Sequence, residues 1–116
     1  MLNSASEQFS SSEITLDNWK DFPFSTHTFQ NVSELIPVRT IAGPGSYEIP
    51  RKMRQDLLTN DYLIAGQAMS AQKILEDTHT DALVICKNGE LVSEYYAHGM
   101  TRESQHLTFS VSKSIT

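Results

Sequence analysis

The end of the chain carries the residues that could do chemistry. Ser110 and Lys113 lie three residues apart, where the pattern predicts the start of a helix. A serine hydroxyl is a weak nucleophile near neutral pH and needs a base beside it. Because residues i and i+3 of a helix share one face, this spacing brings an amine to the hydroxyl. The pair predicts acyl transfer through an acyl-enzyme on Ser110.

A helix start would add further groups that this reaction needs. Its first backbone N–H groups are unpaired and lie at the positive end of the helix dipole, so the amide of Ser110 could donate to an oxyanion. Lys113 acts as a base only in its neutral form, which an ordinary lysine adopts well above pH 7. We expect the neighbours that favour this form to come from residues that this chain does not contain.

The same spacing occurs a second time, at Ser70 and Lys73. Short motifs match by chance, so context must separate the two pairs. Ser70 precedes Ile74 and Leu75, which fall on one helix face, so we interpret Ser70 as an N-cap and Lys73 as solvated. Ser110 is followed by small and apolar residues suited to burial, which makes it the better candidate nucleophile.

The clearest local pattern is a β-hairpin over residues 82–97. Residues 82–86 are apolar and rich in β-branched side chains, and Asn88-Gly89 suits a type I′ turn. The first strand has no polar face, so we expect neighbours on both of its sides and Cys86 in the core. No other stretch has a strong strand pattern. The flanking sheet is therefore expected to lie outside this chain.

The first half of the chain is less regular. Residues 1–17 are Ser-rich and polar, and we predict that they are disordered. Residues 18–64 mix aromatic side chains with prolines, and we interpret them as an extended arm with a short helix. Disorder is the alternative, but disordered segments are poor in aromatic residues. Residues 65–116 form the third region.

Composition excludes several classes of partner. The net charge is −5 and no basic stripe is visible, so we expect no nucleic-acid partner. No apolar run is long enough for a membrane span, and the first residues do not resemble a secretory signal. A single cysteine fits a reducing compartment, so we expect a cytoplasmic protein. The four histidines show no metal-ligand spacing, and neither a metal nor another cofactor is expected.

Three groups of residues together resemble a known family. They are residues 78–85 with Asn88-Gly89, residues 95–100 and residues 106–114, the last containing Ser110 and Lys113. They resemble serine hydrolases of the class C β-lactamase-related family, and most of all its 6-aminohexanoate-dimer hydrolase and carboxylesterase branch. The resemblance implies an α+β protein, the N-terminal part of a β-lactamase/transpeptidase-like fold.

The resemblance also implies roles and limits. In this family the Ser of Ser-x-x-Lys is acylated and the Lys assists proton transfer, which implies these roles for Ser110 and Lys113. The implied substrates are small-molecule amides or esters, such as 6-aminohexanoate oligomers. The family's Tyr-x-Asn, Ser-x-Asn, Lys-Thr-Gly and His-x-Gly motifs are absent, and its members are much longer. We therefore expect residues 65–116 to be a truncated start of the hydrolase domain, whose partner is the missing C-terminal portion of the fold.

Two other interpretations stay open. The chain could be a catalytically inactive product of truncation or of a split gene, or a complete small interaction module with a chance Ser-x-x-Lys. The apolar strand without neighbours and the helix that ends uncapped at Thr116 argue against the module. We expect Ser110 of the isolated chain to be unreactive, because its hydroxyl lacks an activated partner.

Overall fold

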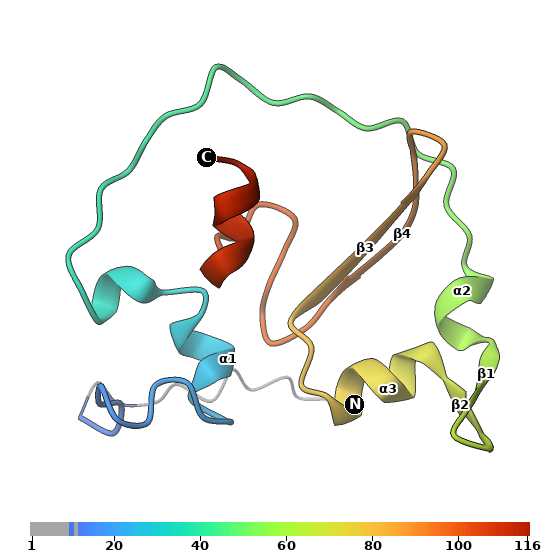
Figure 1. Ribbon diagram of the computed structural model, residues 1–116, viewed down its shortest axis with the longest axis horizontal. Coiled ribbons are helices and arrows are strands. Elements are labelled where there is room, and N and C mark those ends of the chain that lie inside the picture. The colour runs from blue at the N-terminus through green and yellow to red at the C-terminus, as the bar shows by residue number, and fades with distance from the viewer. Residues whose placement is uncertain (1–9, 11) are drawn as a thin grey trace. The chain divides into compact units, whose positions relative to one another are not determined.

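The computed structural model describes residues 10 and 12–116, which form two compact units (Figure 1). Unit 1 contains the described residues up to Ile41 together with His98–Thr116, and unit 2 is Ala42–Ala97. Most of the segment predicted to be disordered, residues 1–17, lies outside the described residues. The predicted domain boundaries stay a prediction.

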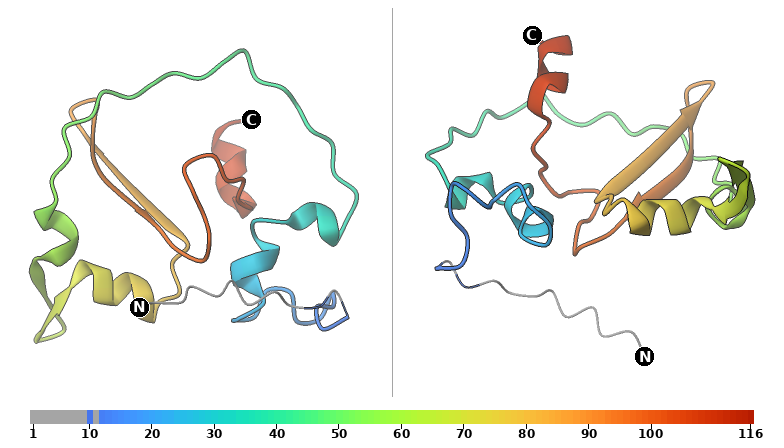
Figure 2. Two further views of the ribbon diagram at one scale, coloured as in Figure 1. Left: turned by 180° about the vertical axis from the view of Figure 1, so that it is seen from behind. Right: turned by 60° about the horizontal axis from the view of Figure 1, so that its bottom comes forward.

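The centre of unit 2 is the expected hairpin. Strands β3 (Ala82–Lys87) and β4 (Glu90–Tyr96) pair antiparallel, and Lys87 lies opposite Glu90. The two turn residues, Asn88 and Gly89, have φ angles of 52° and 77°. Asparagine and glycine adopt this left-handed region readily, so the turn closes two paired strands at low cost. Figure 2 shows β3 and β4 side by side in two further views.

The outer edge of β4 is covered by the chain that precedes α2 (Asp56–Thr59). The N–H groups of residues 52 and 54 donate to the carbonyls of Leu91 and Val92 at 2.9 and 2.8 Å. Leu91 and Val92 are only 5% and 6% exposed, and among the described residues they form the buried hydrophobic core. An ion pair between Arg51 and Glu94, at 2.6 Å, joins the same two segments.

Helix α3 (Ala71–Asp77) confirms the second helix prediction. The Ser70 hydroxyl accepts a hydrogen bond from the backbone N–H of Lys73 at 3.1 Å, which is an N-cap. The Lys73 side chain forms an exposed ion pair with Asp77 one turn later. The Ser70–Lys73 spacing is therefore structural.

A second hairpin forms where the sequence has no strong strand pattern. β1 (Asp61–Ile64) and β2 (Gln67–Ser70) pair antiparallel around Ala65-Gly66. Their sequences, Asp-Tyr-Leu-Ile and Gln-Ala-Met-Ser, do not alternate apolar and polar residues. Ala65 has a φ of 48°, an angle that alanine rarely adopts, so the turn has no strong sequence signal.

The expected burial of Cys86 is also wrong, since this side chain is exposed. Within the described chain β3 pairs with β4 alone, and Val84 on the same strand is 49% exposed. An apolar run predicts a buried strand only where further elements cover it. That the covering elements lie outside this chain stays a prediction.

Unit 1 contains short helical elements: α1 (Ser25–Thr28), the 3₁₀ turn η1 (Val32–Glu34) and the 3₁₀ helix η2 (Phe109–Ser114). From residue 36 to residue 50 the chain is exposed, with no helix or strand. In the part of the chain that the structure describes, no helix has both the length and the apolar character to cross a bilayer.

Candidate functional site

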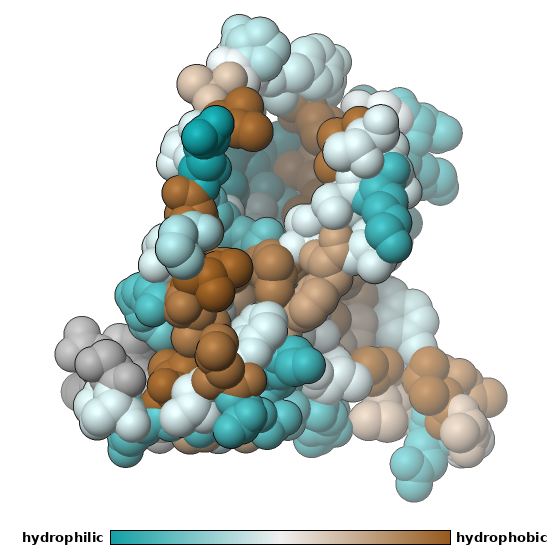
Figure 3. All heavy atoms as spheres, turned by 60° about the vertical axis from the view of Figure 1, so that its left-hand side comes forward, coloured by the Kyte–Doolittle hydropathy of each residue, from teal (hydrophilic) through white to brown (hydrophobic). Residues whose placement is uncertain are grey.

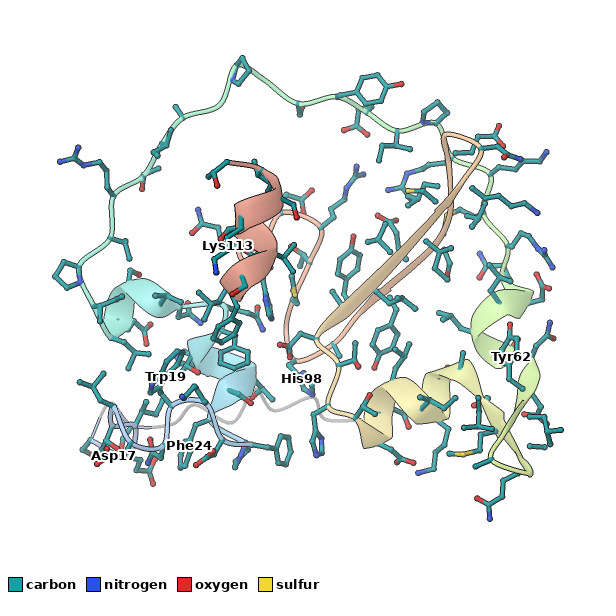
Figure 4. All side chains as sticks on the ribbon, viewed as in Figure 1. Asp17, Trp19, Phe24, Tyr62, His98 and Lys113 are labelled. Atoms are coloured by element: carbon teal, nitrogen blue, oxygen red, sulfur yellow. The ribbon has the colours of Figure 1, made fainter. Side chains whose placement is uncertain are left out.

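Ser110 and Lys113 both lie on η2, which is a 3₁₀ helix (Figure 4). Its turns are closed by hydrogen bonds from the N–H of Val111 to the carbonyl of Thr108, at 3.2 Å, and from Ile115 to Ser112, at 3.0 Å. In a 3₁₀ helix residues i and i+3 eclipse, so Ser110 and Lys113 leave the helix on the same side. The expected shared face is therefore present.

The two side chains are not bonded to each other. Among the described residues, no hydrogen bond or ion pair joins Ser110 to Lys113, and both are exposed. The predicted hydroxyl–amine contact is thus not formed in this structure. Val111 and Ile115 are 67% and 83% exposed, so the expected burial of the residues after Ser110 is wrong for this chain. A site that excludes water would need further walls.

The residue before the candidate nucleophile has an unusual backbone. Phe109 has a φ of 48°, in the left-handed region. For a residue with a Cβ this conformation costs about 1–2 kcal/mol. Such strain persists only where surrounding contacts determine the conformation, and it gathers at functional sites.

Two aromatic side chains supply these contacts at Phe109. Its ring stacks on Trp19, with centroids 6.4 Å apart and planes at 17°, and it meets Phe29 edge to face, 5.5 Å away. Trp19 and Phe29 also contact each other, at 5.9 Å and 77°. Each such pair contributes about 0.5–1.5 kcal/mol beyond area burial, so two pairs offset strain of the size expected at Phe109. We call Trp19, Phe29 and Phe109 the aromatic clamp.

Two hydrogen bonds to backbone carbonyls hold the clamp in place. The N–H of Leu107 donates to the carbonyl of Phe29 at 2.8 Å, which ties the approach to η2 onto the N-terminal segment. The hydroxyl of Thr28, only 2% exposed, donates to the carbonyl of Trp19 at 2.5 Å. The sequence assigned Trp19 and Phe29 to the arm without a role at the site. Their aromatic character among prolines was the available signal.

A hollow of about 330 Å³ lies in unit 1 beside the approach to η2. Its walls combine apolar side chains with one guanidinium and one imidazole, and Thr108 at its rim is two residues from Ser110. Figure 3, turned so that the left-hand side of Figure 1 comes forward, shows hydrophobic residues gathered on the face toward the viewer. The lining residues are Phe29, Gln30, Val32, Ser33, Val38, Arg39, Thr40, Ile41, Gln105, His106, Leu107 and Thr108.

Comparison with known proteins tests the predicted resemblance to 6-aminohexanoate-dimer hydrolase. No family model matches the chain. A relative from Paenarthrobacter ureafaciens, named 6-aminohexanoate-dimer hydrolase, is 32% identical over 103 residues. The chain is a homologue of 6-aminohexanoate-dimer hydrolase. The match covers 89% of this chain and 25% of that hydrolase, so the chain spans about a quarter of its relative's length.

A solved structure of a protein with the same name has a similar fold over the matched residues. A protein from Bacillus anthracis, with a provisional assignment as a 6-aminohexanoate-dimer hydrolase, superposes with a TM-score of 0.78 at 24% identity. The superposition covers 90% of this chain and 27% of that one. The predicted kinship is confirmed, and so is the α+β class, as part of a β-lactamase-like fold. Over the matched residues the chain is similar to a hydrolase.

Proposed function

We propose that this chain supplies the nucleophile of a serine hydrolase that cleaves amide or ester bonds in small molecules. The observation that carries the proposal is Ser110, an exposed hydroxyl directly after the strained Phe109 and on the same side of η2 as Lys113. Homology to a hydrolase over nearly the whole chain supports it.

The proposed reaction proceeds in two steps. The Ser110 oxygen attacks the substrate carbonyl carbon, while its proton passes to the neutral amine of Lys113 and then to the leaving amine or alcohol. The negative charge on the carbonyl oxygen is met by backbone N–H groups, including that of Ser110. Water then attacks the acyl-enzyme, releases the acid and restores the hydroxyl.

The proposed substrate class follows from the relative's name. A 6-aminohexanoate dimer is a linear amide with a charged amine at one end and a carboxylate at the other. We propose linear amides of this type, or simple carboxyl esters, as substrates. The groups that would complete the site are proposed to lie in sequence corresponding to the three quarters of the relative that this chain does not match.

The test is covalent labelling with a fluorophosphonate, read by mass spectrometry. It uses the 116-residue chain and a joined protein, in which this chain replaces the matched region of the Paenarthrobacter relative. We expect labelling of the joined protein at Ser110, loss of labelling in Ser110→Ala, and retention in the matched control Ser70→Ala. The isolated chain should stay unlabelled, because within the described residues no hydrogen bond joins Ser110 to Lys113 and both are open to water.

One result would contradict the role of Ser110, and another would contradict the need for further sequence to complete the site. A joined protein that folds but is not labelled at Ser110 would favour the catalytically inactive alternative. Strong labelling of the isolated chain, lost in Ser110→Ala and kept in Ser70→Ala, would show that no further sequence is needed.

A further inference from the structure

We infer that Trp19 and Phe29 are positioning residues for the proposed nucleophile, because they hold the backbone of Phe109 in the conformation that directs Ser110. This inference rests on the proposed function of Ser110. It assigns to the N-terminal segment a part in the site that its sequence does not indicate.

Phe109 connects η2 to the segment that precedes it. Phe109 is the first residue of η2, and its φ of 48° sets the direction in which the helix leaves the preceding segment. A change to negative φ would reorient the following peptide plane and with it the Ser110 side chain. The conformation of residue 109 therefore controls where the hydroxyl lies.

Local sequence does not favour the positive φ of Phe109. A phenylalanine strongly prefers negative φ, and η2 has no side-chain cap at Thr108 that would compensate. The contacts that retain the positive φ are the two ring contacts to Trp19 and Phe29, from a segment distant in sequence. Phe109 is itself 53% exposed, so deep burial does not fix it.

Phe29 of the clamp also contacts the residues that precede Phe109. The Leu107 N–H bond to the Phe29 carbonyl, at 2.8 Å, lies two residues before Phe109. His106 meets the Phe29 ring edge to face, with centroids 5.9 Å apart. The N-terminal segment thus contacts the residues before η2 through a backbone hydrogen bond and through aromatic rings.

The conformational arm of the test uses the 116-residue chain. A residue at positive φ gives a strong intraresidue NOE between its amide and α protons. We expect this signal at Phe109 in the wild type and in Trp19→Phe, and its loss in Trp19→Leu. Tyr47→Leu is the matched control, because it removes an aromatic ring that is 83% exposed and outside the clamp. An unchanged signal in Trp19→Leu would overturn the inference.

The chemical arm uses the joined protein and the rate of Ser110 labelling. Misplacing a nucleophile slows reaction steeply, so we expect Trp19→Leu to lower the maximal labelling rate about tenfold or more, and Trp19→Phe to restore most of it. The probe concentration for half-maximal rate should stay unchanged. Equal maximal rates in wild type and Trp19→Leu would overturn the inference alone, whereas an unlabelled wild type would overturn the proposed function.

Discussion

At the scale of residues, the two Ser-x-x-Lys pairs have the same spacing but different bonding partners. Ser70 and Lys73 are both satisfied within α3, one as a backbone cap and the other in an ion pair with Asp77. Ser110 and Lys113 make no such bonds within the described residues, although they share one side of η2. Structural use thus accounts for the first pair and leaves the second available for chemistry.

This contrast predicts opposite effects on stability. Ser70→Ala removes an N-cap bond and should lower the free energy of unfolding by about 0.5–2 kcal/mol. Ser110→Ala removes no hydrogen bond of its side chain and should leave that free energy nearly unchanged. Urea unfolding of both variants, followed by circular dichroism, measures the difference. Destabilisation by Ser110→Ala equal to that by Ser70→Ala would mean that Ser110 has a structural role.

At the scale of elements, the β3–β4 hairpin shows how far local sequence reaches. Asn88 and Gly89 were identified from their type alone, and both have the positive φ that the turn requires. The β1–β2 hairpin has no such signal, because its Ala65-Gly66 turn requires positive φ from an alanine. A hairpin is predictable when its turn residues prefer the angles they adopt.

Adding a Cβ at Gly89 in the β3–β4 turn should therefore lower the stability of the protein. A Cβ at Gly89 would meet nothing within 4 Å, so the cost of Gly89→Ala is the strain of a φ of 77°. We expect a loss of about 1–2 kcal/mol in the free energy of unfolding. Gly43→Ala is the control, because its Cβ also meets nothing and its φ is not left-handed. Equal urea midpoints for the two variants would refute this account of the turn.

At the scale of the whole molecule, the chain forms two units, and the boundary after Ile41 falls within exposed chain that has no helix or strand. Residues 36–50 are exposed throughout, while residues 50–54 are paired to β4. Exposed segments without paired backbone are the preferred sites of proteolysis. The arrangement predicts where a protease first cuts.

Brief trypsin treatment should cleave first after Arg39. Arg51, by contrast, is in an ion pair with Glu94 and precedes backbone that is bonded to β4. Mass spectrometry of the earliest fragments identifies the cut, and Arg39→Gln should delay fragmentation. A first cut within residues 51–54 would mean that their pairing with β4 is weak.

The sequence alone determined the features that depend on near neighbours and on ancestry. They are the β3–β4 turn, the Ser70 cap, the shared side of Ser110 and Lys113, and kinship with 6-aminohexanoate-dimer hydrolase. The first three span a few residues, so helix spacing and turn chemistry are enough to reveal them. The kinship was inferred from resemblance of longer stretches to a known family.

Only the tertiary structure decided which residues surround η2. Trp19 and Phe29 meet Phe109 across most of the chain's length, and no local pattern encodes that contact. The positive φ of Phe109 opposes its own preference, so it exists only because distant rings hold it. The exposure of Cys86 likewise depended on how many elements cover β3, which composition does not reveal.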